Sequence, residues 1–118
     1  MQFEPSDRAK DYVARTRAFM REHIEPVEAA FWAEVAEHTH GGDFRRWRVP
    51  AVLDELRAKA RAAGLWNMFL PDAELGAGLS VLEYALVAEE TGRSQLAPTV
   101  FNCNAPDTGN MEVLYRYG

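Results

Sequence analysis

Apolar side chains recur every three or four positions along the first third of the chain, the spacing of one face of an α-helix. Ser6 and Asp7 precede this stripe as N-cap candidates, and the pattern continues to about Glu37. Pro26 interrupts it, because proline has no N–H to donate to the preceding turn, so we expect a kink or restart near Glu25. The stripe consists of Ala9, Tyr12, Val13, Phe19, Met20, Ile24, Val27, Phe31 and Val35.

A second helix is predicted after a loop at 38–43 that contains two glycines. Pro50 suits the first turn of this helix, and Gly64 suits the position just after its end. The residues expected to face the core repeat at helical spacing, and they are Val52, Leu53, Leu56, Ala60 and Ala63. An extended apolar segment and a turn-rich loop with further glycines are expected to follow.

Two more helices are predicted in the last third of the chain. Ser80 and Glu83 match the capping box, in which the serine caps a helix and the glutamate reaches back to it. This helix is expected to run to about Thr91, and Asp107 or Thr108 is expected to cap a final helix. No convincing alternating strand pattern occurs, so we predict an all-α fold of four to five helices in one domain over residues 1–118.

Composition narrows the classes of partner. The chain has 47% apolar and 26% charged residues, which is typical of a globular protein. Its net charge of -5 argues against nucleic acid or an anionic membrane as partner. A single cysteine cannot form an internal disulfide, which favours a reducing compartment, and the first residues show no signal peptide, so we expect a cytoplasmic protein. No apolar run approaches the ~18 residues of a membrane span.

Residues that could carry chemistry have simpler structural interpretations. Neighbouring carboxylates at Glu89 and Glu90 point to different sides of a helix, so we expect at most one to face inward. His38 and His40 lack the third and fourth ligands that a metal site needs, so no metal site is predicted. Cys103 has no local basic partner to lower its pKa and is interpreted as a small buried thiol.

Local basic and aromatic residues form one further patch, which consists of Arg45, Arg46, Trp47 and Arg48. Arginines of this kind can contact phosphate. The favoured interpretation is a solvated loop with one anchoring aromatic. From the residues alone, the chain is a helical domain without a self-contained active site.

The order and the amino-acid sequences of four segments resemble the N-terminal helical domain of the acyl-CoA dehydrogenases. The segments are GLWNMFLP at 64–71, GAGLS at 76–80, EYALVAEETG at 83–92 and FNCNAPDTGNME at 101–112. The last is similar to the branch that handles longer or hydroxylated acyl chains. The resemblance covers essentially all 118 residues.

The resemblance implies an FAD-dependent enzyme that removes two hydrogens across the α,β bond of an acyl-CoA thioester. It also implies a middle β domain, a C-terminal helical bundle, assembly into homo-oligomers and an electron-transfer flavoprotein as partner. No glutamate here matches the family's catalytic base, and no FAD site is expected in this chain. We therefore expect no catalytic and no cofactor-binding residue, and no activity from the 118 residues alone.

The resemblance places the segment before the final helix beside the acyl-chain cavity. Phe101 and Ala105 are expected to line an apolar slot, while Asn102 and Asn104 are expected to meet either a polar acyl substituent or loop backbone. Both alternatives for the asparagines stay open.

The chain ends inside its final helix, which favours a fragment of a full dehydrogenase over a free-standing helical binding or protein-interaction module. On its own it is expected to self-associate through an apolar patch of Trp66, Met68, Phe69 and Leu70.

Overall fold

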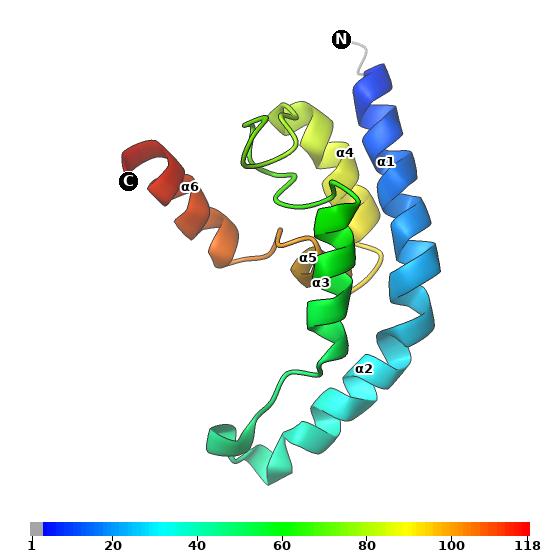
Figure 1. Ribbon diagram of the computed structural model, residues 1–118, viewed down its shortest axis with the longest axis vertical. Helices are drawn as coiled ribbons and strands as arrows, with labels where there is room; N and C mark the ends of the chain where they lie inside the picture. Colours follow the sequence, from blue (N-terminus) through cyan, green and yellow to red (C-terminus); the bar gives the residue numbers. More distant parts are fainter. Residues whose placement is uncertain (1–3) are drawn as a thin grey trace.

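A bent helical rod runs the length of the molecule in the computed structural model, which describes residues 4–118. The rod consists of α1 (Asp7–Phe19), a π-helical turn η1 (Met20–Ile24) and α2 (Glu25–His38) (Figure 1). Ser6 caps α1, since its hydroxyl accepts a hydrogen bond from the N–H of Ala9 at 3.0 Å. The predicted cap and single stripe are thereby confirmed.

The proline in the rod sits where the helix restarts. The N–H of Glu25 reaches the carbonyl of Met20 across the wide π turn, and Pro26 then occupies the first turn of α2. Proline is tolerated in the first turn of a helix, where its missing N–H costs least. The expected restart near Glu25 is confirmed.

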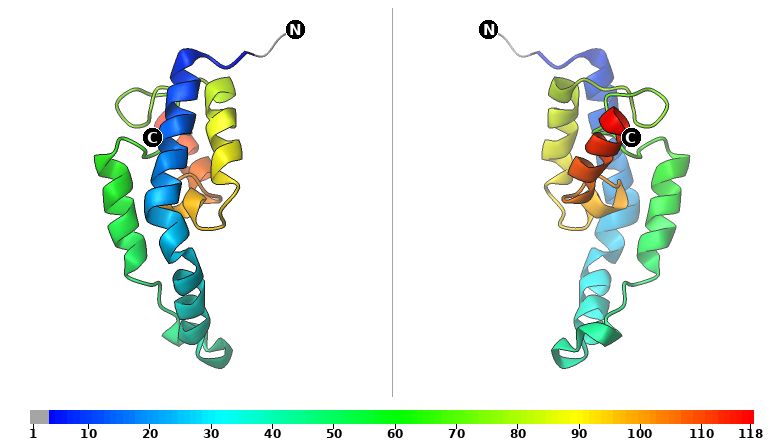
Figure 2. Two further views of the ribbon diagram at one scale, coloured as in Figure 1. Left: turned by 90° about the vertical axis from the view of Figure 1, so that its right-hand side faces the viewer. Right: turned by 90° about the vertical axis from the view of Figure 1, so that its left-hand side faces the viewer.

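Helix α3 (Val52–Ala62) and helix α4 (Val81–Thr91) lie on opposite sides of this rod in the side views of Figure 2, whereas α6 (Asp107–Tyr117) projects from the body of the molecule. Two short 3₁₀ turns, η2 (His40–Gly42) and η3 (Phe44–Arg46), lead to α3 (Val52–Ala62). After a long loop come α4 (Val81–Thr91), the single turn α5 (Ala97–Val100) and α6 (Asp107–Tyr117). No strand occurs between residues 4 and 118, so the all-α prediction is confirmed.

The core lies where α1, α3, α4 and α5 meet. Its most completely buried large side chains come from all parts of the chain, and they include Phe101, Ile24, Leu56, Leu65, Met68, Leu79 and Leu96. Burial of each such side chain contributes about 1.5–3 kcal/mol relative to leaving it exposed. From the predicted α3 stripe, Leu53, Leu56 and Ala60 are buried, but Ala63 is exposed because the helix ends one residue before it.

The last two long helices, α4 and α6, differ in how their N-termini are capped. Ser80 accepts from the N–H of Glu83 at 3.1 Å, and Glu83 accepts from the N–H of Ser80 at 2.9 Å, so the predicted capping box is confirmed. The predicted cap of α6 is wrong, because Asp107 already lies inside the helix and no side chain bonds its first turn. An acidic residue in the first turn still favours the helix through its dipole.

Exposed apolar residues lie elsewhere than predicted. Met68, Phe69 and Leu70 are buried and Trp66 is half-buried, so the patch expected at 66–70 is wrong. That segment is not extended but coils inward under the loop that follows it. The exposed apolar side chains of α4 and α6 are Val81, Leu82, Val113, Leu114, Tyr115 and Tyr117, and α6 projects from the body of the molecule (Figure 1).

Among the described residues, no helix is long and apolar enough to cross a membrane.

Candidate functional site

The predicted acyl-wall residues lie on one connected segment between α5 and α6, but they face different surroundings. Phe101 ends α5 and is 0% exposed, with its ring 5.3 Å from that of Phe19 between centroids. Ala105, four residues later, is exposed. The segment therefore runs from the core of the domain to its surface.

Asn102 is held within the chain by its amide. The amide donates to Oδ1 of Asn67 at 2.8 Å and approaches Sδ of Met111 at 3.6 Å. Its backbone has a φ of 56°, the left-handed region that asparagine tolerates better than most residues. Of the two alternatives for Asn102, these contacts favour the structural one.

Asn104 differs from Asn102 in having an unsatisfied atom. Its Oδ1 is buried and accepts no hydrogen bond from any residue between 4 and 118, while its Nδ2 makes only a long contact of 3.5 Å with the carbonyl of Ala105. Buried polar atoms nearly always have a partner. Asn104 Oδ1 is thus a buried acceptor that no residue between 4 and 118 satisfies.

A cleft of about 280 Å³ adjoins this segment, between the start of α4 and the start of α6. Its lining residues are Phe69, Val81, Tyr84, Cys103, Thr108 and Glu112. None of the four predicted residues lines it, but Cys103 and Thr108 come from the same stretch. Tyr84 lies in the helix that the sequence predicts after Ser80, and its spacing carries no signal of a cleft.

Two of the ionisable groups that line this cleft, Cys103 and Tyr84, have raised pKa values. Burial raises the pKa of the Cys103 thiol, and Sγ donates to the carbonyl of Phe101 at 3.3 Å. Burial also raises the pKa of the Tyr84 hydroxyl well above its ordinary value, with a smaller contribution from Cys103. Cys103 is half-buried and protonated, so it suits packing rather than nucleophilic attack.

The glycine-rich loop at 72–79 folds onto its own backbone. Asp72 Oδ1 accepts from the N–H groups of Glu74 and Leu75 at 2.9 and 2.8 Å, and its carbonyl accepts from those of Gly76 and Gly78 at 3.0 Å. These hydrogen bonds lower the pKa of Asp72. The loop N–H groups are thereby used internally, so the loop offers no cradle for a nucleotide phosphate.

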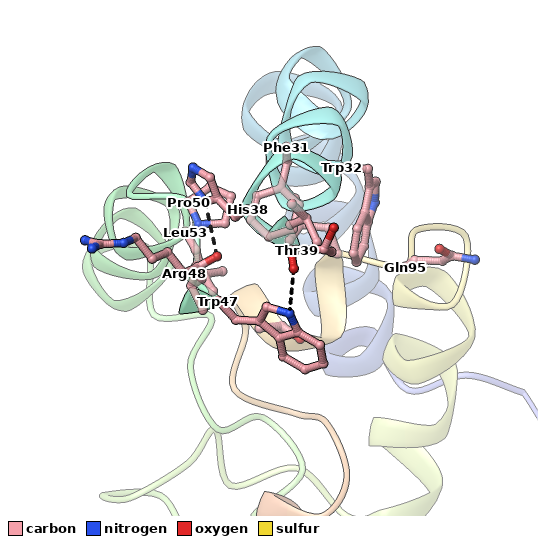
Figure 3. Close-up of a pocket in the computed structure, with 13 residues that line it drawn as sticks. Phe31, Trp32, His38, Thr39, Trp47, Arg48, Pro50, Leu53 and Gln95 are labelled. Atoms are coloured by element: carbon pink, nitrogen blue, oxygen red, sulfur yellow. Dashed lines mark hydrogen bonds between the residues drawn. The ribbon is translucent and has the colours of Figure 1, made fainter. Parts of the chain in front are cut away.

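A larger groove of about 500 Å³ lies at the other end of the molecule, beside the end of α2 (Figure 3). It is walled by indole rings of Trp32 and Trp47, which are 40% and 59% exposed. The other lining residues are Phe31, Val35, His38, Thr39, Arg48, Val49, Pro50, Leu53, Gln95, Leu96 and Thr99. The sequence interpretation found one wall of this groove, the loop around Trp47, but not the groove itself.

Two hydrogen bonds fold the loop of this groove back onto α2. Trp47 Nε1 donates to the carbonyl of Thr39 at 3.1 Å, and His38 Nδ1 lies 3.2 Å from the carbonyl of Arg48 (Figure 3). Burial, then the charges of Arg46, His38 and Arg48, lower the pKa of His40. Trp47 is the anchoring aromatic that the sequence predicts for this loop.

The carboxylate pair on α4 divides as predicted. Glu90 is 6% exposed and receives two hydrogen bonds of 2.9 Å from Nε and Nη2 of Arg17, while Glu89 is exposed. These hydrogen bonds lower the pKa of Glu90. The Arg17–Glu90 ion pair joins α1 to α4 beside a smaller hollow of about 210 Å³ and lies away from the two cavities described above, so it is a structural contact. No group of three potential metal ligands occurs in residues 4–118.

Comparison with known proteins agrees over nearly the whole chain. The family profile "Acyl-CoA dehydrogenase, N-terminal domain" matches residues 6–118. "Acyl-CoA dehydrogenase family member 11" of Gallus gallus is 48% identical over 118 residues, which is 98% of this chain and 14% of that protein. "Probable acyl-CoA dehydrogenase FadE2" of Mycobacterium tuberculosis is 44% identical over 124 residues, which is 100% of this chain and 28% of that protein.

A solved structure from Mycobacterium abscessus, described as that of an acyl-CoA dehydrogenase, superposes with a TM-score of 0.87 at 57% identity. The match covers 98% of this chain and 29% of that one. The chain thus spans between a seventh and a third of the length of these relatives. By its sequence and its fold, the chain belongs to the acyl-CoA dehydrogenase family and corresponds to the family's N-terminal helical domain.

Proposed function

We propose that this chain acts as the N-terminal helical part of an FAD-dependent acyl-CoA dehydrogenase, which oxidises the α,β bond of an acyl-CoA thioester. The observation that carries the proposal is the family match over residues 6–118, at 57% identity to a chain of the same fold. The proposed contribution of this domain is part of the wall of the acyl-chain pocket.

The proposed wall has two layers. Asn104 and Ala105 reach the surface, and Cys103 lines the cleft beside them. Phe101 and Asn102 stand behind, where Phe101 fills the core and Asn102 holds the turn. The buried Oδ1 of Asn104 has no partner among residues 4–118. Because an unmade buried hydrogen bond is costly, we propose that the loop around Asn104 rearranges in the whole protein, so that a hydroxyl on an acyl chain or an N–H from another part of the protein satisfies this atom.

FAD and the catalytic base are proposed to belong to other parts of the whole protein. When bound, FAD supplies the acceptor for the hydride that leaves the β carbon. Among the described residues, the glycine-rich loop does not suit a phosphate of FAD, because the N–H groups of Gly76 and Gly78 are already bonded to the carbonyl of Asp72. A carbon acid also needs a sheltered base, and the carboxylate at the cleft, Glu112, is exposed.

Assembly and location complete the proposal. We propose a homo-oligomer and an electron-transfer flavoprotein partner by analogy with the family, and a reducing, cytoplasmic compartment because the chain has a single cysteine. These features concern the whole protein.

The test uses the natural protein that carries this sequence, purified with its flavin. Acyl-CoAs from short to long, plain and hydroxylated, are mixed with it anaerobically, and flavin absorbance is followed. At least one acyl-CoA should reduce the flavin and so bleach its absorbance. Asn104→Ala should slow flavin reduction by hydroxylated acyl-CoAs more than by plain ones. The matched control is Asn110→Ala, an exposed asparagine of α6. A flavin that no acyl-CoA reduces would refute the activity.

FAD titration of the 118-residue chain separates the proposal from a flavin site within this domain. No saturable quenching of flavin fluorescence is expected at micromolar FAD. Saturable quenching would place a flavin site in this domain and contradict the division of labour proposed above.

A second function, a helical binding module without catalysis, is favoured by one observation. The groove between Trp32 and Trp47 is apolar, partly open and of the size of small-molecule sites, about 300–1,000 Å³. Binding of an apolar probe that quenches tryptophan in the 118-residue chain, and that Trp47→Ala abolishes, would support this function. Absence of such quenching would contradict the binding-module function, and the dehydrogenase function would remain as the single proposal.

A further inference from the structure

Asn67 joins two segments that the sequence keeps far apart, the glycine-rich loop and the turn at 101–102. All four of its polar groups make hydrogen bonds. Toward the turn, its N–H donates to the carbonyl of Phe101 at 3.1 Å, and its Oδ1 accepts from the amide of Asn102 at 2.8 Å. Toward the loop, its Nδ2 donates to the carbonyl of Leu75 at 3.2 Å, and its carbonyl accepts from the N–H of Leu70 at 3.0 Å.

The backbone around this junction leaves little freedom. Asn67 and Asn102 both have left-handed backbones, with φ of 53° and 56°. A β carbon at Gly76 would overlap the carbonyl oxygens of Asn67 and Leu70, so the loop packs directly on the junction. Non-glycine residues adopt such φ values only where surrounding contacts compensate the strain. The side-chain pair between the two asparagines is the contact that joins these two strained residues.

The same junction orients α6. Asn102 contacts Sδ of Met111, and Tyr115 donates to Oδ2 of Asp72 at 3.1 Å, so α6 is tied to both segments. No residue of α6 is buried, which means that packing in this chain does little to hold it. The position of the cleft residues Thr108 and Glu112 therefore depends on these polar contacts.

We propose that Asn67 is a positioning residue that sets the acyl-chain preference of the enzyme without contacting the substrate. The inference rests on the proposed function, since it needs the segment from Phe101 to Ala105 to border the acyl chain. Asn67 fixes where that segment leaves the core, and it couples the segment to the loop at 72–79. Loss of the side chain then shifts the wall and changes which chain length fits.

Asn67→Gly is the informative variant. Glycine accepts a positive φ without strain, so this change removes both side-chain hydrogen bonds and spares the backbone. Asn67→Asp keeps an acceptor for the amide of Asn102 but loses the donor to Leu75. Asn110→Ala, on the exposed side of α6, serves as the control. Asn102→Ala breaks the same side-chain pair from its other end.

The first measurement is hydrogen exchange in the natural protein, which needs no activity. Asn67→Gly should speed exchange at amides of both 70–78 and 101–104, whereas Asn102→Ala should do so mainly at 101–104. Faster exchange confined to 70–78 in Asn67→Gly would show that the two segments are not coupled and would overturn the proposal.

The second measurement is kcat/KM over a series of acyl-CoA lengths. Asn67→Gly should shift the ratio between the best and the neighbouring chain lengths about 10-fold, the scale of one methylene in an apolar pocket. The change should lie in KM, with kcat on a well-fitting substrate nearly unchanged, and Asn67→Asp should recover part of the original preference. A uniform loss of kcat/KM across all acyl-chain lengths in Asn67→Gly, with no recovery in Asn67→Asp, would show that Asn67 serves folding alone.

The outcomes separate this inference from the function on which it rests. A wild-type protein that oxidises no acyl-CoA refutes both. A protein that oxidises acyl-CoAs with the same length preference in Asn67→Gly as in wild type refutes the positioning role alone.

Discussion

Phe101 shows how a residue at a predicted site can serve the fold first. It is completely buried against Phe19, so truncation leaves a cavity in the core. We expect Phe101→Ala to lower the free energy of unfolding of the chain by about 3–5 kcal/mol, measured by urea denaturation. Val81→Ala, at a side chain that is 77% exposed, should change it by less than about 0.5 kcal/mol. Equal losses of unfolding free energy in the two variants would contradict the placement of Phe101 in the core.

Glu90 makes stability depend on pH. Its hydrogen bonds from Arg17 hold its pKa below the ordinary value of about 4.5. A carboxylate with a lowered folded pKa stabilises the protein above the unfolded pKa, and that contribution is lost as the pH falls through the folded pKa. Glu90→Gln should therefore reduce the melting temperature at pH 7, and the difference from wild type should shrink below about pH 4.5.

The exposed neighbour Glu89 provides the control for this pH series. Glu89→Gln should leave the melting temperature unchanged at every pH. A Glu90→Gln difference that stays constant from pH 7 to pH 3 would show that folding does not lower the pKa of Glu90.

The two long helices that pack together, α1 and α4, share one cap. Glu83 accepts from the N–H of Ser80 at the start of α4 and from the hydroxyl of Ser6, at 2.7 Å, at the start of α1. These hydrogen bonds lower the pKa of Glu83. One carboxylate thus aligns the N-termini of both helices, an arrangement that a local capping box does not itself imply.

Ser80→Ala should destabilise the chain by about 1 kcal/mol, because the N–H of Glu83 loses its cap. Ser80→Asp keeps an acceptor at the cap and should restore most of the stability. Thermal unfolding followed by circular dichroism measures both variants. An unchanged melting temperature in Ser80→Ala would mean that water replaces the cap at no cost.

At the scale of the whole molecule, α6 exposes apolar surface that the rest of the chain leaves uncovered. Val113, Leu114 and Tyr117 are exposed on a helix that has no buried residue. We expect the 118-residue chain to self-associate through this helix, seen as a concentration-dependent mass in light scattering. The double change Val113→Glu and Leu114→Lys should shift the measured mass toward that of a monomer.

The control for self-association lies in the segment at 66–70, which the sequence predicts as the exposed apolar patch. Trp66 is the apolar member of the 66–70 segment that is not fully buried, and Trp66→Gln should leave the mass distribution of the folded chain unchanged. A monomer at all concentrations, in wild type and variants alike, would show that the exposed face of α6 does not drive association.

Local signals determined the elements of this protein. Ser6, Pro26, Gly64 and the Ser80–Glu83 box act through backbone groups within about four residues, so their effects can be read from a single sequence. Helical spacing also indicated the core residues of α1, η1, α2 and α3, because one face of a helix must be covered. The core residues contributed by loops and by α5 carry no such spacing. The family resemblance rested on such segments, and it named the fold correctly.

Only the tertiary structure decided which distant groups meet. Glu90 finds Arg17 73 positions away, and Asn102 finds Asn67 35 positions away. The segment at 66–70 is buried because the loop at 72–79 folds over it, and the groove exists because Trp47 returns to α2. Side-chain spacing carries no record of these pairings, since they depend on how helices pack and loops close. The sequence determined the helices and the family, and packing determined what the asparagines do.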